Sequence, residues 1–175
     1  RLAALDRIAY AKRLGDRLSN MAICMKSAKR YEEALEVLEE SSDVLSSADD
    51  MNGLVRVMGN RGLVFMDLQN YAEADKIFQE AYKVSYNAFQ GHPSEKTVQA
   101  FQLSCVNVGL HLKTMIDEGL IPEAKKREAI TDALKHFYYA ITVSNRVDKH
   151  LLQRAVMNVA DIYEKYYDRN AQNIA

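Results

Sequence analysis

The chain has 175 residues, of which 48% are hydrophobic and 27% charged, and its formal net charge is −1 at pH 7. This composition is typical of a folded domain, and the small net charge argues against bulk attraction to nucleic acid or to an anionic membrane. No apolar run approaches the ~20 residues that a membrane-spanning helix needs, and two cysteines are too few for a disulfide framework, which favours a cytoplasmic (intracellular) setting.

Helical patterns with short polar breaks run along the whole chain. Seven Gly and two Pro are few, and strand-like runs of Val, Ile and Thr are missing, so the pattern predicts an all-α protein. Asp49 or Asp50 is expected to cap one helix, and Ser94 follows a Gly-His-Pro stop in the same role. The chain opens on Arg1 without a Met or a targeting pattern, which indicates a piece of a longer protein.

The sequence repeats itself at a constant offset of 40 residues. Leu18 to Met25 aligns with Met58 to Phe65, and Tyr31 to Ala34 aligns with Tyr71 to Ala74. Each copy has a small residue midway along the first helix and an aromatic residue at the start of the second, then Ala, a large residue and a small one. This order lets two antiparallel helices approach closely, with the large residue filling the space beside the small one.

This pattern resembles the tetratricopeptide repeat over nearly the whole chain, with a unit longer than the ~34 residues usual in that family. The resemblance implies an all-α, right-handed superhelix of antiparallel helix pairs, an α-solenoid, formed as a single array over residues 1–175. Its expected parts are the second helix of a truncated repeat (1–12), repeat 1 (15–48), repeat 2 (50–90), repeat 3 with an insertion near 116–127 (94–145), and the first helix of a further repeat (150–168).

Repeat 3 departs from the family pattern because its second helix is delayed by about a dozen residues. Gly109 takes the small place on the first helix. Beyond the insertion, Ala133, Phe137 and Ala140 take the small and large places on the second helix. We therefore expect Phe137 to fill the space beside the small residue of repeat 3, as the large residue Phe78 does in repeat 2.

One polar residue type recurs on the predicted first helices. Asn20, Asn60, Asn107 and Asn158 each stand two places before the small residue. An amide side chain both donates and accepts, so it can bind the backbone of a peptide whatever the peptide's sequence, as similar asparagines do in several peptide-binding members of the family. The alternative is that each Asn bonds to a neighbouring helix inside the array.

Apolar and basic side chains follow these asparagines at helical spacing on the same face. Together they predict a concave groove that binds a peptide or a helix of a protein partner, although the apolar residues can equally pack against adjacent first helices. The candidate groove residues are Asn20, Ile23, Lys26, Arg56, Asn60, Leu63, Met66, Asn107, Leu110, Lys113, Arg154 and Asn158.

The alternative function is a structural scaffold that self-associates through its repeat ends. Residues 31–50 carry acidic side chains without Lys or Arg, whereas residues 1–30 are rich in basic ones, and such segregated charge can join two molecules. An enzyme is not expected, because no zinc-protease motif, phosphate loop or nucleophile elbow is present. The histidines lack metal-ligand spacing, so we expect no catalytic residues, no metal, no cofactor, no nucleic acid and no membrane partner.

Overall fold

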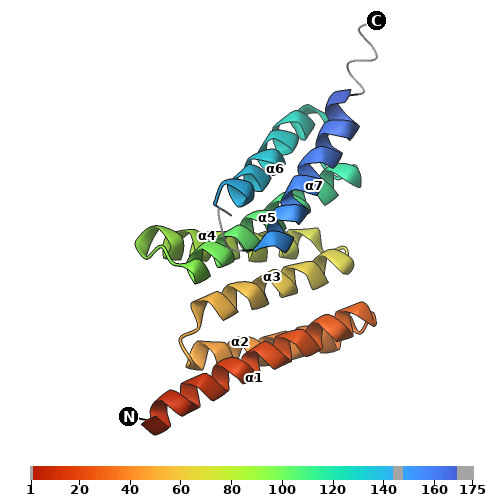
Figure 1. Cartoon of the computed structure of the whole chain (residues 1–175). Helices are drawn as coiled ribbons and strands as arrows, with labels where there is room; N and C mark the ends of the chain where they lie inside the picture. The colour runs from red at the N-terminus through yellow and green to blue at the C-terminus, as the bar shows by residue number, and fades with distance from the viewer. Residues whose placement is uncertain (1, 144–147, 169–175) are drawn as a thin grey trace, which may run out of the picture. The chain divides into compact units, whose positions relative to one another are not determined.

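The computed structural model describes residues 2–143 and 148–168, and over these residues the chain is helical, with no strand (Figure 1). The elements are α1 (Leu2–Ser27), α2 (Tyr31–Ser47), α3 (Met51–Asp67), α4 (Tyr71–Gly91), α5 (Glu95–Asp117), α6 (Glu123–Val143), α7 (Lys149–Tyr163) and the π-helical turn η1 (Glu164–Asp168). Consecutive helices pack as pairs, which confirms the predicted all-α, solenoid-type architecture. The handedness of the whole array stays a prediction.

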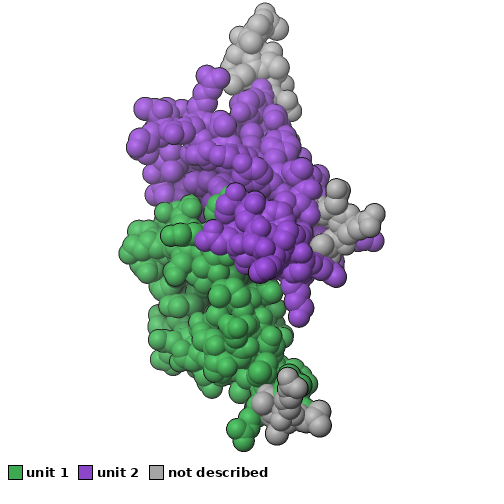
Figure 2. Space-filling model, turned by 90° about the vertical axis from the view of Figure 1, so that its left-hand side faces the viewer, with its two compact units in different colours: residues 1–85 green, residues 86–175 purple. Residues whose placement is uncertain are grey.

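The chain divides into two compact units, residues 1–85 and residues 86–175, which Figure 2 distinguishes by colour. The boundary lies within α4, so this helix belongs to both units. Unit 1 contains α1, α2, α3 and most of α4. Unit 2 contains the end of α4, together with α5, α6, α7 and η1.

The core of unit 1 lies where α1, α2 and α3 meet. Its buried members come from all three helices: Ala22, Ala34, Leu38, Leu45, Val57 and Val64. The α3–α4 pair is closed by Gly62 and Phe78, since a Cβ atom added to Gly62 would lie 2.6 Å from Cζ of Phe78. That distance is too short for any side chain, so the glycine is what lets the phenylalanine ring fill the space between the helices.

The expected separate helix over residues 1–12 is wrong. Over the described residues, α1 continues without a break from Leu2 to Ser27, so these residues are the first turns of the same helix that carries Asn20. No Pro or capping residue stops the helix before Gly15, and a single Gly is tolerated in a helix at a cost of about 1 kcal/mol. Gly15 has a packing role instead, because a Cβ atom there would lie 2.5 Å from Cγ of Leu45.

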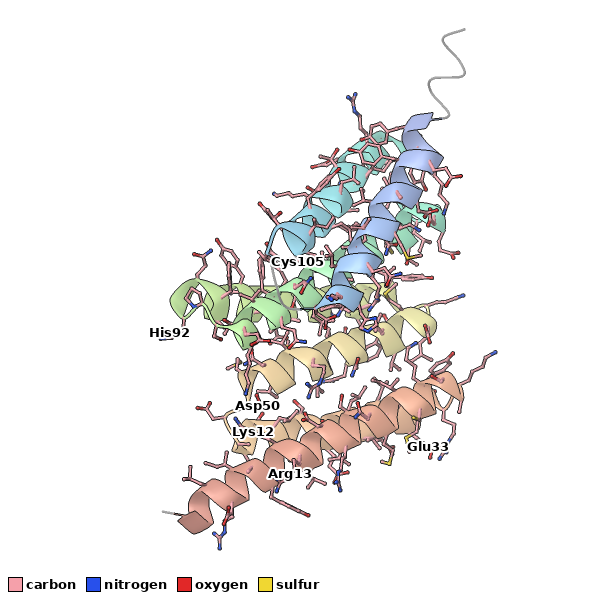
Figure 3. The ribbon with its side chains drawn as sticks, viewed as in Figure 1. Lys12, Arg13, Glu33, Asp50, His92 and Cys105 are labelled. Atoms are coloured by element: carbon pink, nitrogen blue, oxygen red, sulfur yellow. The ribbon has the colours of Figure 1, made fainter. Side chains whose placement is uncertain are left out.

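The turns between helices follow the sequence signals. Asp50 caps α3 by accepting a hydrogen bond from the backbone N–H of Gly53, at the start of the helix in Figure 3. Ser94 and Thr97 form a capping box at the start of α5. This confirms Ser94 as the predicted cap, after the α4 helix has ended at Gly91. The left-handed backbone conformation recurs in four of the turns, at Lys29, Asp49, Gln69 and Gly119.

Unit 2 reproduces the same pairing in α5 and α6. A Cβ atom added to Gly109 would lie 2.8 Å from Cε1 of Phe137, as Gly62 does with Phe78. Ala133, Phe137 and Ala140 are all fully buried, which confirms the places predicted for them. The extra residues extend the end of α5 and the start of α6, on either side of the turn that joins them. The helix α7 then packs against both α5 and α6.

Candidate functional site

In unit 1 the candidate groove residues lie on α1 and α3, the two first helices. Asn60 of α3 donates a hydrogen bond from Nδ2 to Oγ of Ser19 on α1, over 2.9 Å. This contact joins neighbouring helices, which is the alternative that the sequence left open for the recurring asparagines. Asn20, one residue beyond Ser19, is exposed on α1.

The two basic residues expected on this face of unit 1 are already paired. Lys26 of α1 lies 2.7 Å from a carboxylate oxygen of Asp67 at the end of α3. Arg56 of α3 forms an ion pair with Asp16 of α1. Both pairs join the first helices, and an acidic ligand has to compete with these carboxylates for the same cations.

Between the Ser19–Asn60 contact and the Lys26–Asp67 contact lie the apolar candidates. Ile23 is 41% exposed, whereas Leu63 and Met66 are partly buried. The helical spacing places Ile23 one turn after Ser19 and Leu63 one turn after Asn60. We call this strip, made of Asn20, Ile23, Asn60, Leu63 and Met66, the α1–α3 strip.

The candidates in unit 2 lie on α5 and α7, and their surroundings differ. Asn107 is buried, and its Oδ1 accepts no hydrogen bond within the described part of the chain. Asn158 donates from Nδ2 to the backbone oxygen of Arg154 in its own helix, over 2.8 Å. Leu110 is partly buried and the Arg154 side chain is exposed. The recurrence of Asn therefore does not correspond to one recurring contact.

Lys113 belongs to an ion network that joins α5, α7 and η1. Its Nζ lies 2.8 Å from Asp117 and 2.6 Å from Asp161. Lys165 lies 3.2 Å from Asp161, and the Tyr166 hydroxyl donates to Asp117 over 2.7 Å. The π-helical turn brings Lys165 and Tyr166 to this network.

The network shifts the pKa values of its members. Partial burial opposes the charge of Lys113, but its hydrogen bonds to the two aspartates outweigh this effect and raise its pKa. The hydrogen bond from Lys113 lowers the pKa of Asp161. Burial and the hydrogen bond to Asp117 raise the pKa of Tyr166 to about 12. At neutral pH the network therefore holds two cations, two anions and a neutral phenol, and it has no net charge.

Sequence reasoning missed the partners of the predicted residues. Asp16 and Arg56 stand 40 residues apart, so opposite charges at equivalent places of successive repeats were the available signal. Ser19 and Asn60 also lie close to one repeat offset, since they are 41 residues apart, and their polar side chains are the corresponding signal. No comparable signal existed for Tyr166, because its position depends on the π-helical turn.

Other chemistry-bearing groups include the cysteines and the possible metal-binding side chains. Both cysteines are free thiols; Cys24 is exposed, whereas burial raises the pKa of Cys105 far above its usual range. Among the described residues no group of His, Cys, Asp and Glu has the arrangement of a metal site. No helix in the described part is both long and apolar enough to cross a membrane.

A cavity of about 500 Å³ lies at the start of α6. Its walls are side chains from α6 and η1: Glu123, Lys126, Arg127, Ile130, Tyr166 and Tyr167. The Lys126 ammonium lies over the Tyr166 ring, 5.7 Å from its centroid, an arrangement in which the ring face attracts the cation. The cavity therefore combines two basic side chains with two aromatic ones.

One of two comparisons with known proteins agrees with the helix pairing. A comparison with curated proteins finds no significant match. Residues 13–87 match the sequence profile of the tetratricopeptide repeat, a family whose fold is generally a non-catalytic module for protein–protein interaction. The match spans the α1–α2 and α3–α4 pairs, including Ala22 and Leu38 of the first pair and Gly62 and Phe78 of the second. Over residues 13–87 the helix pairs are thus similar to the tetratricopeptide repeat.

Proposed function

We propose that the α1–α3 strip binds a segment of a protein partner, so that the chain acts as an interaction module through its first helices. The observation that carries the proposal is the exposure of Ile23 between two polar contacts that fix α1 against α3. An apolar side chain held exposed on a rigid surface is a suitable anchor point for an apolar residue of a partner.

The ion pairs indicate what kind of segment is favoured. Because Lys26 and Arg56 already have carboxylate partners, an acidic peptide gains little net charge attraction there. Apolar contact with Ile23 and Leu63, with hydrogen bonds from the exposed Asn20 amide to the peptide backbone, is the more favourable combination. We therefore expect a segment with apolar side chains at alternate or helical spacing.

The experiment uses the natural difference between the two cysteines. A photo-crosslinker attached to the exposed Cys24 lies one turn from Asn20 and captures whatever binds the strip, while the buried Cys105 stays unlabelled. The captured segment is then synthesised, and its affinity for the chain is measured by fluorescence anisotropy.

Ile23→Ala and Asn20→Ala should each weaken binding, and Ile23→Ala by about tenfold, or roughly 1.4 kcal/mol. Leu120→Ala is the matched control, because Leu120 is an exposed apolar residue in the α5–α6 turn and does not belong to the strip. Equal affinity of the Ile23→Ala variant and the wild type would rule out the strip as the binding site.

A self-associating scaffold remains the second candidate. The first turns of α1 expose Leu5, Ile8 and Tyr10, and Lys12 and Arg13 follow them on the same helix (Figure 3). The opposite charge lies on α2, an acidic helix whose first turn contains Glu33, labelled in the same view. If these surfaces join two molecules, light scattering should report a mass that rises with concentration and falls with added salt; a constant monomer mass excludes the scaffold.

A further inference from the structure

The insertion that departs from the repeat pattern forms one wall of the cavity at the start of α6. Glu123, Lys126 and Arg127 line this cavity and lie in the first turns of α6, within the inserted stretch. The next turn contributes Ile130, an apolar lining residue that is only 7% exposed. The residues that distinguish repeat 3 from repeat 2 therefore border a space of about 500 Å³, a size that is common for small-molecule sites.

The opposite wall of the cavity consists of Tyr166 and Tyr167 from the π-helical turn η1. The Tyr166 hydroxyl donates a hydrogen bond to Asp117 over 2.7 Å, and Asp117 is the last residue of α5, also in the inserted stretch. Such π-helical turns are rare and occur frequently at functional sites. The insertion thus positions both walls of the cavity, directly on α6 and through Asp117 on η1.

The charged side chains of the cavity do not compensate one another fully. Lys126 lies 3.5 Å from Glu123, and its ammonium lies over the Tyr166 ring, so its charge already has two partners. The Glu123 side chain is 87% exposed, and ion pairs in such exposed places are weak. Arg127 has no carboxylate partner among the side chains that the structure describes. The lining therefore carries one net positive charge, which Arg127 leaves uncompensated.

We propose that this cavity binds a small organic monoanion with a flat apolar body, such as an aromatic carboxylate. The Arg127 guanidinium suits the acid group, because it can donate two parallel hydrogen bonds to a carboxylate. The Tyr167 ring and Ile130 suit the flat body, because both offer apolar surface for it to pack against. A single negative charge on the ligand balances the net charge of the lining. The site shares no residue with the α1–α3 strip.

Three probe compounds separate the contributions of charge and apolar surface. Naphthoate has an acid group and a flat aromatic body, naphthamide has the same body without the charge, and acetate has the charge without the body. Isothermal titration calorimetry measures the binding of each to the full chain. Naphthoate should bind most tightly, naphthamide about tenfold more weakly, and acetate should give no measurable heat of binding at the same concentrations.

Variants of the chain locate the binding. Arg127→Gln should raise the dissociation constant of naphthoate about tenfold and leave that of naphthamide unchanged. Lys125→Gln is the matched control, because it removes the same charge from an exposed residue of α6 outside the cavity lining. Tyr167→Ala should weaken the binding of both naphthalene compounds. Glu123→Gln should tighten naphthoate binding, because it frees Lys126 from its ion pair; a general loss of structure would not produce that gain.

Three results would overturn the proposal. If naphthoate and naphthamide bind the wild type equally, the charge of the ligand is not recognised. If Arg127→Gln and Lys125→Gln weaken naphthoate binding equally, the effect comes from the net charge of the protein and not from the cavity. A wild type that binds no naphthoate at millimolar concentration, while circular dichroism shows it folded, excludes the cavity as a site for this class of ligand.

Discussion

Replacing Gly62 by Ala should destabilise unit 1 through a single methyl group. The added Cβ atom lies 2.6 Å from Cζ of Phe78, a ring that is almost fully buried. Overpacking a well-filled core costs about 1–3 kcal/mol, and the better helix propensity of Ala returns about 1 kcal/mol. The expected net loss in the free energy of unfolding is therefore up to about 2 kcal/mol, or up to several degrees in melting temperature at roughly 2–4 °C per kcal/mol.

Gly91→Ala is the matched control for this substitution. A Cβ atom there has no neighbour within 4 Å, so only the propensity effect applies and the melting temperature should stay the same or rise. Thermal and urea unfolding, followed by circular dichroism, measure all variants. Amide hydrogen exchange in α3 and α4 then shows whether the loss is local to the pair.

The double variant Gly62→Ala/Phe78→Leu isolates the contact. Leu is shorter than Phe, so the methyl group added at position 62 meets less resistance, and the two substitutions together should cost less than the sum of their separate costs by at least about 0.5 kcal/mol. If Gly62→Ala is as stable as the wild type, or if the two costs simply add, then the close contact between Gly62 and Phe78 does not determine the packing of this pair.

Further predictions concern the thiols, the ion network and a helix cap. In the native chain a thiol reagent should modify Cys24 quickly and Cys105 only after unfolding, because Cys105 is buried; equal rates in mass spectrometry would contradict this. Because the pKa of Asp161 in the folded chain is lowered below its ordinary 3.8, its contribution to stability is present above that value and is lost as the pH falls through the folded pKa. Lys113→Met should remove about 1 kcal/mol at pH 7 and less at pH 3, as measured by urea unfolding at both values; an equal loss at both would show that the ionised aspartates are not involved. Asp50→Ala should cost about 1 kcal/mol by removing the α3 cap, while Asp50→Ser should retain most of the stability.

The helix pairs were predictable because their signals are local. The small and large residues that meet, such as Gly109 and Phe137, follow one order in every repeat, so the order identified the contact even across an insertion. The continuity of α1 was missed because the family pattern suggested a repeat boundary where the chain has only Gly15. A glycine alone does not end a helix when it has a packing role.

The side-chain contacts of the candidate site were less predictable. Whether Asn60 faces a ligand or Ser19 depends on the angle and distance between α1 and α3, which no residue pattern specifies. The partner of Lys113 depends likewise on how α7 packs against α5. Opposite charges at one repeat offset were a usable signal for Asp16 and Arg56, but the π-helical turn that positions Tyr166 had none.

The insertion in the third helix pair shows where this architecture tolerates growth. The added residues lengthen α5 and α6 at the turn that joins them, whereas the Gly109–Phe137 contact is the same as the Gly62–Phe78 contact of the shorter pair. The length of the two helices is therefore determined at the turn that joins them, whereas the distance between the helices is determined by the contact between the glycine and the phenylalanine. A protein engineer can use the α3–α4 turn at residues 68–70 in the same way, extending both helices there to carry an epitope or a fluorophore without repacking the core.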